Sequence, residues 1–314
     1  MSHTETDRRK PKKKKEKGAI ATWLEYSAFL TLRGVVRALP LRLTTTAATA
    51  MGRLAFLLLR KHRRRTIQHI LFSGVTERAW LAKRIASQSF VGLARTGVES
   101  LKLDQFARQI DLANNIVPSY SSGVGNVLEE GRGFILVSAH FGNWELSGLL
   151  CSNFEKPLHA VMRPLKNPRL NTWVTEHRKQ FGQKVVNKQG ALRRLFRTLK
   201  NNGNVAMLVD QRANHADGVM TKFFGHPALS HPAPALLHLK TGAPLLVGAC
   251  RRLPGLFRFE FIARGPFTIK RTGDTAHDVQ ALTQLYTSEL EDIIRSEPSQ
   301  WLWTARRWEA TRKK

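Results

Sequence analysis

The sequence has little cysteine, few acidic residues and no long uncharged apolar run, and each shortage excludes a class of protein. Only two cysteines, Cys151 and Cys250, occur among 314 residues. That number excludes a fold held together by several disulfides and fits a reducing compartment. The 23 Asp and Glu residues are outnumbered by 51 Lys and Arg residues, so the formal net charge is +28. Such a charge predicts an anionic partner, either nucleic acid or a membrane surface with phosphorylated lipids.

The absence of a long apolar run decides how the N-terminal region is interpreted. A membrane-spanning helix needs about 18–20 residues nearly free of charge, whereas residues 18–59 are interrupted repeatedly by charged side chains. We expect an amphipathic helix lying in the membrane interface, separated by Pro40 from a second helix that ends near Leu59. The basic run Arg60–Arg65, with five fixed cations, suits a phosphate-rich surface. The alternatives are two ordinary amphipathic helices packed on the domain, or a single tilted span.

The chain divides into three regions. Residues 1–17 form a lysine-rich tail with a net charge of +5 and almost no apolar residues, so we expect it to be disordered. Residues 18–65 form the expected membrane-associated helical region, and residues 66–314 form the main folded domain. Because most of the positive charge lies outside the tail, the anionic partner is expected to contact the folded part. No signal peptide is evident.

The stretch Phe134–Glu145 combines a strand, a polar residue and a helix start. An apolar, β-branched run ends abruptly at His140, and Asn143 can cap a helix that begins at Trp144. This order places His140 at the carboxyl edge of a sheet, where ligands bind in open α/β folds. We predict that Glu145 folds back onto the imidazole, keeps one ring nitrogen protonated and leaves the other free to accept a proton. The alternative is a locally bonded histidine and a glutamate that merely suits a helix start.

Two further strands are predicted to end on polar residues. Leu158–Met162 is followed by Arg163, and Asn204–Val209 is followed by Asp210 and Gln211. If these strands are parallel neighbours of the first, the polar residues gather on one edge of the sheet. The alternation predicts an α/β fold with a mixed, largely parallel sheet flanked by helices.

The remaining chain is predicted to be mostly helical before this region and mixed after it. Residues 75–130 are predicted to be helical, and Gly123 and Gly125 follow no predicted strand, so they do not form a dinucleotide-binding loop. Residues 213–231 are predicted to be a polar loop. The chain is then expected to continue as a helix, two strands and a long C-terminal helix.

Other functions must explain the same residues. A serine hydrolase could use Ser138, but the glycines of a nucleophile elbow are missing. A metal enzyme could use His226, His231 and His238, whose spacing follows no zinc pattern. A non-catalytic basic protein that binds membranes or nucleic acid would explain the charge, but no aromatic residues interleave the basic ones as in nucleic-acid binders.

The chain resembles the glycerolipid-type acyltransferases, in which a histidine is followed after four residues by a carboxylate. It is most similar to their bacterial branch, the lauroyl/myristoyl acyltransferases of lipid A biosynthesis. The matching pieces, in chain order, are Leu24-Glu-Tyr26, Leu39-Pro-Leu-Arg42, Ser138-Ala-His-Phe-Gly-Asn-Trp-Glu145, Arg163-Pro-Leu-Lys-Asn-Pro168, Leu208-Val-Asp-Gln211, Phe223-Phe-Gly225 and Pro298-Ser-Gln-Trp-Leu-Trp303 with Arg306-Arg-Trp308. The chain departs from the family in its lysine tail, at Thr304-Ala305 and at His231-Pro-Ala233.

The resemblance implies an O-acyltransferase domain at residues 66–314. The sequence contains no catalytic pair of acidic residues and no nucleotide-binding loop, so we expect no cofactor. The resemblance also implies transfer of a fatty acyl chain from acyl carrier protein, or acyl-CoA, to a hydroxyl of a phosphorylated lipid A precursor at the cytoplasmic face of the inner membrane. Other acceptors left open are a lysophospholipid, an ornithine lipid and a phosphoinositol mannoside. His140 is assigned as the general base and Glu145 as its partner.

Further residues are assigned to substrate binding. Arg163 is a candidate for a lipid phosphate or the oxyanion, unless it pairs with an acid such as Asp210. Asn143 contacts substrate or only caps the helix. Asp210 is expected to orient Arg163 or Arg178. Arg306 and Arg307 are expected to contact phosphates or the carrier protein. The other residues assigned to substrate binding are Gln211, Arg178 and Phe224.

Overall fold

The computed structural model describes residues 18–105, 115–146, 150 and 156–308. The lysine-rich tail, Cys151 and the residues directly after Leu146, where a helix was expected to continue, lie outside this part. The helices are α1 (Ala19–Ala38), α2 (Leu41–Leu58), α3 (Arg60–Phe72), α4 (Ala79–Leu101), α7 (Ser122–Glu129), α9 (Pro168–Lys179), α10 (Ala191–Lys200), α11 (Ala233–Thr241) and α12 (Thr275–Ser296), with short 3-10 turns η1 (Trp144–Leu146) and η2 (Pro298–Gln300). The strands are β1 (Ile116–Tyr120), β2 (Ile135–Ser138), β3 (Leu158–Met162), β4 (Gln183–Asn187), β5 (Asn204–Leu208), β6 (Val219–Phe223), β7 (His226–Ser230), β8 (Leu245–Arg252) and β9 (Phe259–Phe267).

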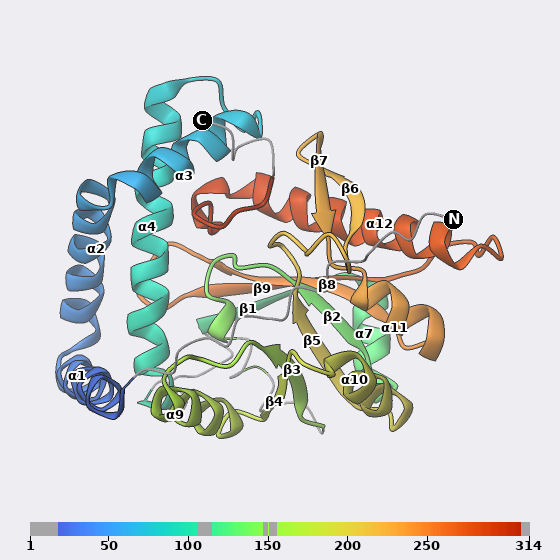
Figure 1. Cartoon of the computed structure of the whole chain (residues 1–314), viewed down its shortest axis with the longest axis horizontal. Coiled ribbons are helices and arrows are strands. Elements are labelled where there is room, and N and C mark those ends of the chain that lie inside the picture. Colours follow the sequence, from blue (N-terminus) through green and yellow to red (C-terminus); the bar gives the residue numbers. More distant parts are fainter. Residues whose placement is uncertain (1–17, 106–114, 147–149, 151–155, 309–314) are drawn as a thin grey trace, which may run out of the picture.

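A seven-stranded sheet lies at the centre of the molecule, in the order β1-β9-β8-β2-β5-β3-β4 (Figure 1). Strands β8, β2, β5, β3 and β4 are parallel, and β9 runs antiparallel to β8. The predicted α/β class with a mixed, largely parallel sheet is therefore confirmed. Because β2, β5 and β3 are parallel neighbours, the residues that follow them lie along one edge, as the sequence predicted.

The two faces of the sheet belong to separate hydrophobic cores, because side chains alternate along each strand. Ile135 and Val137 of β2 pack with residues from α3, α4, α10, α11 and α12. Leu136 faces the other way and packs with residues of α7 and with Phe181, two residues beyond the end of α9. The edge of the sheet between these layers carries the polar residues considered below.

Two predicted segments differ from the structure. Residues 116–120 form strand β1, although residues 75–130 were predicted to be helical and Gly123 therefore does follow a strand. Pro118 weakens the strand pattern, yet it is tolerated because β1 is an edge strand that pairs only with β9. The predicted polar loop at residues 213–231 contains the β6–β7 hairpin, which packs against α12 through Gln284 and Lys222.

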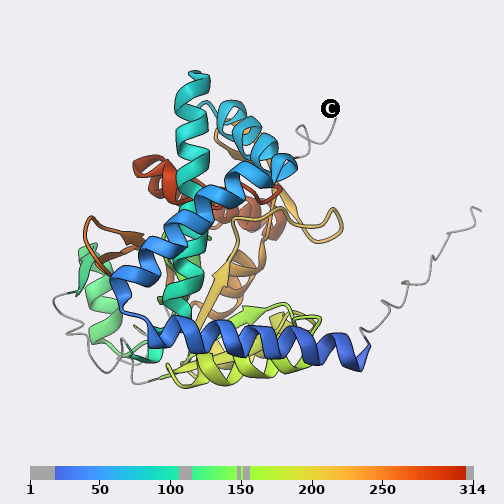
Figure 2. The same ribbon diagram turned by 90° about the vertical axis from the view of Figure 1, so that its left-hand side faces the viewer.

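The N-terminal helices lie against the domain in two different ways, and Pro40 separates α1 from α2 as predicted. Helix α1 runs along α9, and α2 crosses α4 (Figure 2). The α1–α9 contact includes Phe29 and Trp173, whose ring centroids are 4.7 Å apart. Asn167 caps α9 through Oδ1 and donates its amide Nδ2 to the carbonyl of Thr22 on α1.

Much of the outward surface of α1 and α2 is apolar. The exposed side chains are Ile20, Trp23, Leu24, Leu30, Leu32, Val35, Leu39, Leu43, Met51, Leu54, Leu57 and Leu58. An exposed apolar surface of this extent is typical of a protein or membrane interaction site. None of the helices described is long and apolar enough to cross a membrane.

Helices α2 and α4 meet most closely at Gly52. A Cβ atom at this position would lie 2.6 Å from the Cα of Val91, inside any allowed contact. Glycine is therefore required here by the close approach of two backbones rather than by an unusual backbone angle. On α4, Gly92 is the opposite case, because a Cβ there meets nothing within 4 Å.

We predict that Gly52→Val lowers the free energy of unfolding by ~1–3 kcal/mol, because α2 and α4 must separate to accommodate the valine side chain. The matched control, Gly92→Ala, should be neutral or stabilising by up to ~1 kcal/mol, since alanine favours the helix and meets no neighbour. Urea unfolding followed by circular dichroism measures both. Equal stability of Gly52→Val and wild type would contradict the close contact.

Candidate active site

His140 lies just beyond the end of β2, next to Asp210 at the end of the adjacent strand β5. The imidazole Nδ1 is 2.8 Å from Asp210 Oδ1, and the backbone amide of His140 donates to Asp210 Oδ2 at 3.0 Å. The carboxylate therefore fixes both the tautomer and the orientation of the ring. Among the described residues no hydrogen bond engages Nε2, so this nitrogen is the one available to accept a proton.

Asp210 is buried and accepts hydrogen bonds from two chain segments. Besides His140, the indole Nε1 of Trp301 donates to Oδ2 at 2.8 Å. Burial alone raises the pKa of Asp210, but the charge and hydrogen bonds of His140 and Trp301 more than offset it, so the pKa is lowered. Burial and the charge of Arg178 lower the pKa of His140. The charge and hydrogen bond of Asp210, together with the more distant charge of Glu145, raise it by more. The net shift of the His140 pKa is upward.

The loop after His140 is held from three sides. Gly142 adopts φ +57°, and a Cβ there would lie 1.8 Å from the carbonyl oxygen of Cys250, so no other residue fits. Its amide donates to the carbonyl of Gln300 at 3.0 Å, and its carbonyl accepts from the Thr96 hydroxyl of α4 at 3.0 Å. Strand β8, the C-terminal segment and α4 thus fix the turn that carries His140.

Asn143 closes this turn as the predicted cap and is buried. Its Oδ1 accepts from the amide of Leu146 at 3.3 Å, and its Nδ2 donates to Glu99 of α4 at 2.8 Å. Glu99 in turn forms a buried ion pair with Arg252. Both ends of the Asn143 side-chain amide therefore make contacts that hold the turn in place.

Glu145 does not contact His140, which corrects the predicted pairing. Its carboxylate instead binds the guanidinium of Arg178 on α9, with distances of 2.7 and 3.0 Å to Nη2 and 3.3 Å to Nε. The indole of Trp144 donates to the same carboxylate at 3.1 Å. The physical reason is the turn at residues 141–146, which directs Glu145 across the sheet towards α9, while Asp210 on the neighbouring strand is already in contact with the imidazole.

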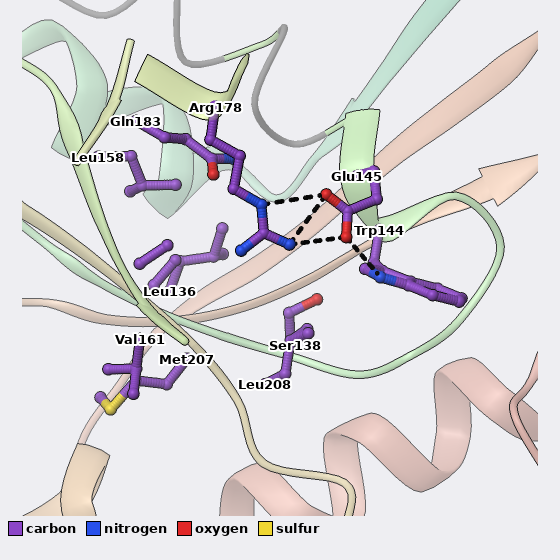
Figure 3. Close-up of a pocket in the computed structure, with 12 residues that line it drawn as sticks. Leu136, Ser138, Trp144, Glu145, Leu158, Val161, Arg178, Gln183, Met207 and Leu208 are labelled. Carbon is purple, nitrogen blue, oxygen red and sulfur yellow. Dashed lines mark hydrogen bonds and ion pairs between the residues drawn. The ribbon is translucent and has the colours of Figure 1, made fainter. Parts of the chain in front are cut away.

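The Glu145–Arg178 pair lines a small, largely apolar cavity of about 60 Å³ (Figure 3). The cavity is formed between the sheet and α9. Its lining residues from alternate positions of three strands are Leu136, Ser138, Leu158, Ala160, Ala206 and Leu208. Its composition, apolar walls with a few polar groups, is that of a small-molecule site, but its volume of about 60 Å³ has room for only a small part of a ligand.

Comparison with known sequences identifies the family. Residues 10–310 match the family described as bacterial lipid A biosynthesis acyltransferase. The chain belongs to this family. It is also similar to phosphatidylinositol mannoside acyltransferases, with 28% identity over 184 residues to that of Mycobacterium tuberculosis (strain ATCC 25618 / H37Rv) and 27% over 186 residues to that of Mycolicibacterium smegmatis. These matches cover 58% of this chain and 56% and 59% of the two relatives, less than two thirds of their length.

In this member of the lipid A acyltransferase family, three of the predicted binding residues are exposed. Arg163 follows β3, one strand beyond Asp210, and among the described residues it forms no ion pair. Gln211 and Arg306 are also exposed. The predicted pairing of Asp210 with Arg163 or Arg178 is wrong, because Asp210 is bonded to His140 and Trp301.

Two other predicted binding residues are buried, which corrects their expected position at a substrate surface. Phe224 packs among the rings of Trp301, Trp303 and Trp308. Arg307 donates to the carbonyl of Leu229 and the hydroxyl of Ser230 at 2.6 Å each. Burial lowers the pKa of Arg307 to about 10. Both residues stabilise the packing of the C-terminal segment, which carries Trp301 to its contact with Asp210.

Sequence reasoning named Asp210 as a site residue but missed its pairing with His140, and it missed the indole of Trp301 and the turn residue Gly142. A glycine between a strand-end histidine and a helix cap is a usable signal for a tight turn. The histidines considered as metal ligands have separate environments. His226 stacks on Phe72, and His238 is 2.9 Å from the carbonyl of Ala243. In the part of the chain that the structure describes, no three His, Cys, Asp or Glu side chains form a metal-binding group.

His231 is the one of these histidines near the site. It is largely buried, and burial together with Lys188 and Arg307 lowers its pKa to about 4 against the opposing charges of Asp210 and Asp217. Its imidazole is therefore neutral at physiological pH.

We predict that Asp210→Asn lowers the pKa of His140, because burial remains while the charge that opposed it is removed. Glu145→Gln should lower it less, since Glu145 acts only through space. The measurement is a pH titration of the imidazole signals of histidine-labelled protein by NMR, with His140→Ala used to assign the resonance. Unchanged titration in Asp210→Asn would contradict the pairing.

Proposed function

We propose that the protein transfers a fatty acyl chain from a thioester of acyl carrier protein to a hydroxyl of a phosphorylated lipid A precursor. The observation that carries this proposal is the His140–Asp210 pair, with Nε2 available, next to an apolar cavity at the carboxyl edge of a parallel sheet. An acyl thioester is already activated, so the reaction needs a general base and stabilisation of the oxyanion rather than a covalent nucleophile.

The chemistry follows from the geometry of the pair. The acceptor hydroxyl hydrogen-bonds to His140 Nε2, which removes its proton as the oxygen attacks the thioester carbonyl. The negative charge of Asp210, 2.8 Å from Nδ1, stabilises the imidazolium that forms. When the tetrahedral intermediate collapses, the C–S bond breaks and the departing sulfur receives that proton.

Arg178 is the cation assigned to the oxyanion. It is partly buried and lines the apolar cavity. It is also close enough to His140 for its charge to lower the pKa of the imidazole. The amides of the turn itself are unsuitable donors, because those of Phe141, Gly142 and Asn143 already donate to backbone carbonyls. Glu145 then acts by holding the guanidinium fork in one orientation. The cavity receives the hydrocarbon next to the carbonyl carbon.

The site is expected to operate at the cytoplasmic face of the inner membrane. The apolar surface of α1 and α2 would enter the interface, and the basic residues of α3 would face lipid phosphates. Attachment to the surface brings the edge of the sheet to an acceptor that remains in the bilayer. A carrier protein, or acyl-CoA as an alternative donor, approaches from the aqueous side.

A phosphatidylinositol mannoside is the second candidate acceptor. The similarity to the mycobacterial enzymes supports it, and both acceptors present a sugar hydroxyl near a phosphate. The residues of the base, the oxyanion and the cavity serve either acceptor equally, so only assay of both distinguishes them.

We predict that His140→Ala lowers acyl transfer at least ~100-fold, the size expected for loss of a general base. Asp210→Asn should lower it by a similar order, because the imidazole loses both its fixed tautomer and the charge that stabilises its protonated form. The assay follows radiolabelled acyl groups from acyl carrier protein to a tetra-acylated lipid A precursor and, separately, to phosphatidylinositol mannoside.

The outcomes separate the parts of this proposal. Activity that survives in His140→Ala would overturn the mechanism. Wild-type transfer to the mannoside but not to the lipid A precursor would replace the acceptor and keep the mechanism. Arg194→Ala, an exposed arginine on α10, is the control for a loss of one positive charge.

We further predict that Arg163→Ala raises the KM for a phosphorylated acceptor by about 10-fold or more, with little change in kcat. The expected size is that of one charge-assisted hydrogen bond to phosphate. Arg163 lies two strand spacings, about 10 Å, from the strand that carries His140, a reach that suits a substituent rather than the reacting hydroxyl. The measurement compares acceptors with and without the phosphate. An equal KM change for both would contradict this assignment.

A further inference from the structure

A second pocket, of about 600 Å³, lies between α2, α4 and the C-terminal turn η2. It is separate from the apolar cavity beside Glu145 and shares no lining residue with it. Four arginines from three elements line it: Arg53 on α2, Arg84 and Arg95 on α4, and Arg252 at the end of β8. Its volume falls in the range of small-molecule sites, roughly 300–1,000 Å³.

The positive charge in this pocket is largely unneutralised. Arg252 is paired with Glu99, but within the described ranges no carboxylate forms an ion pair with Arg53, Arg84 or Arg95, and no Asp or Glu lines the pocket. Arg95 is half-buried, and burial and the neighbouring charge of Arg252 lower its pKa despite Glu99. Its Nε is buried and has no hydrogen-bond partner among the described residues. Several like charges held around one hollow are stabilised by an anion that enters it.

The elements that form the pocket are held together by close packing and hydrogen bonds. Gly52 fixes α2 against α4 next to Arg53, and the Arg252 side chain is held by Glu99. Gln300 accepts from the Arg252 amide at 2.7 Å and donates to the Arg252 carbonyl at 2.8 Å. A site built on fixed elements loses little order when its ligand binds.

The chemistry of the lining selects the ligand. Guanidinium forks match the oxygens of a phosphate in a bidentate way, and several of them suit a doubly charged phosphate. On α2, Phe56 and Leu57 lie one helical turn beyond Arg53 on the same side of the helix; Phe56 is partly exposed and Leu57 is 58% exposed. A phosphate seated in the pocket would therefore leave any attached hydrocarbon over apolar side chains. An acidic protein is a poorer fit, because its surface would have to insert a side chain into the hollow rather than lie flat across it.

We propose that this arginine pocket binds the phosphate head group of an anionic lipid. The inference goes beyond the acyl-transfer reaction proposed above and does not depend on it. Binding is measured without any acyl donor, so failure of this proposal and failure of the reaction are distinguishable.

The test uses the full chain and two probes, a short-chain phosphatidic acid below its micelle concentration and inorganic phosphate. Binding is measured by isothermal titration calorimetry. Wild type should bind the lipid saturably with one site. Arg53→Ala combined with Arg84→Ala should raise its Kd at least about 10-fold, the size expected for losing charge-assisted hydrogen bonds.

Two further variants separate a pocket from general positive charge. Gly92→Phe places a ring in the pocket without a charge change, and its Cβ meets nothing within 4 Å, so the α4 backbone need not shift; circular dichroism checks that the fold is retained. It should also raise the Kd at least about 10-fold. The matched control, Arg193→Ala with Arg194→Ala on α10, removes two exposed arginines outside the pocket and should leave the Kd unchanged.

Each outcome decides the proposal. Loss of binding in both pocket variants with retention in the control supports it. Equal weakening by the α10 control, or unchanged binding by Gly92→Phe, overturns it in favour of non-specific attraction to a basic surface. Inorganic phosphate that binds as tightly as the lipid overturns the lipid assignment and leaves a site for a soluble phosphate.

Discussion

A single buried carboxylate holds the site together. Asp210 accepts hydrogen bonds from the imidazole and the backbone amide of His140 and from the indole of Trp301. A buried charge is costly unless its oxygens are bonded, so this arrangement fixes three segments that are distant in sequence. The imidazole cannot turn without leaving Asp210 Oδ1 without its hydrogen-bond partner. The ring is therefore held in the orientation that the proposed base needs before any substrate binds. The C-terminal aromatic segment contributes to the site indirectly, because its Trp301 bonds Asp210.

The two carboxylates near His140 have different roles because their environments differ. Asp210 is fully enclosed and contacts the ring directly, whereas Glu145 is partly exposed and its charge is shared with Arg178 and Trp144. Glu145, five residues after His140, thus holds Arg178 beside the apolar cavity. The imidazole has Asp210, at the end of the neighbouring strand, as its partner. The sharp turn at Gly142 makes this division possible, since it directs the chain away from the ring.

The sequence was sufficient for the fold class and for the edge on which the site lies, because buried strands followed by polar residues are a local pattern. It was insufficient for the partner of His140, since Asp210 is 70 positions away and Glu145 was an equally plausible acid nearby. The same limit applies to Arg307, whose hydrogen bonds to Leu229 and Ser230 arise only when the C-terminal segment packs against β7. Strand β1 and the β6–β7 hairpin were missed because Pro118 and the polar residues of 213–231 weaken the strand pattern.

Helix α4 connects the surface of the molecule to the chemistry. Its outer side packs on α2 and supplies two arginines of the pocket described above, while Thr96 and Glu99 on its inner side bind the turn after His140. Arg252 contacts both of these residues. An anion in the arginine pocket would therefore lie next to groups that are directly bonded to the turn after His140. Because these groups are bonded to one another, a short chain of hydrogen bonds links the arginine pocket to the turn after His140.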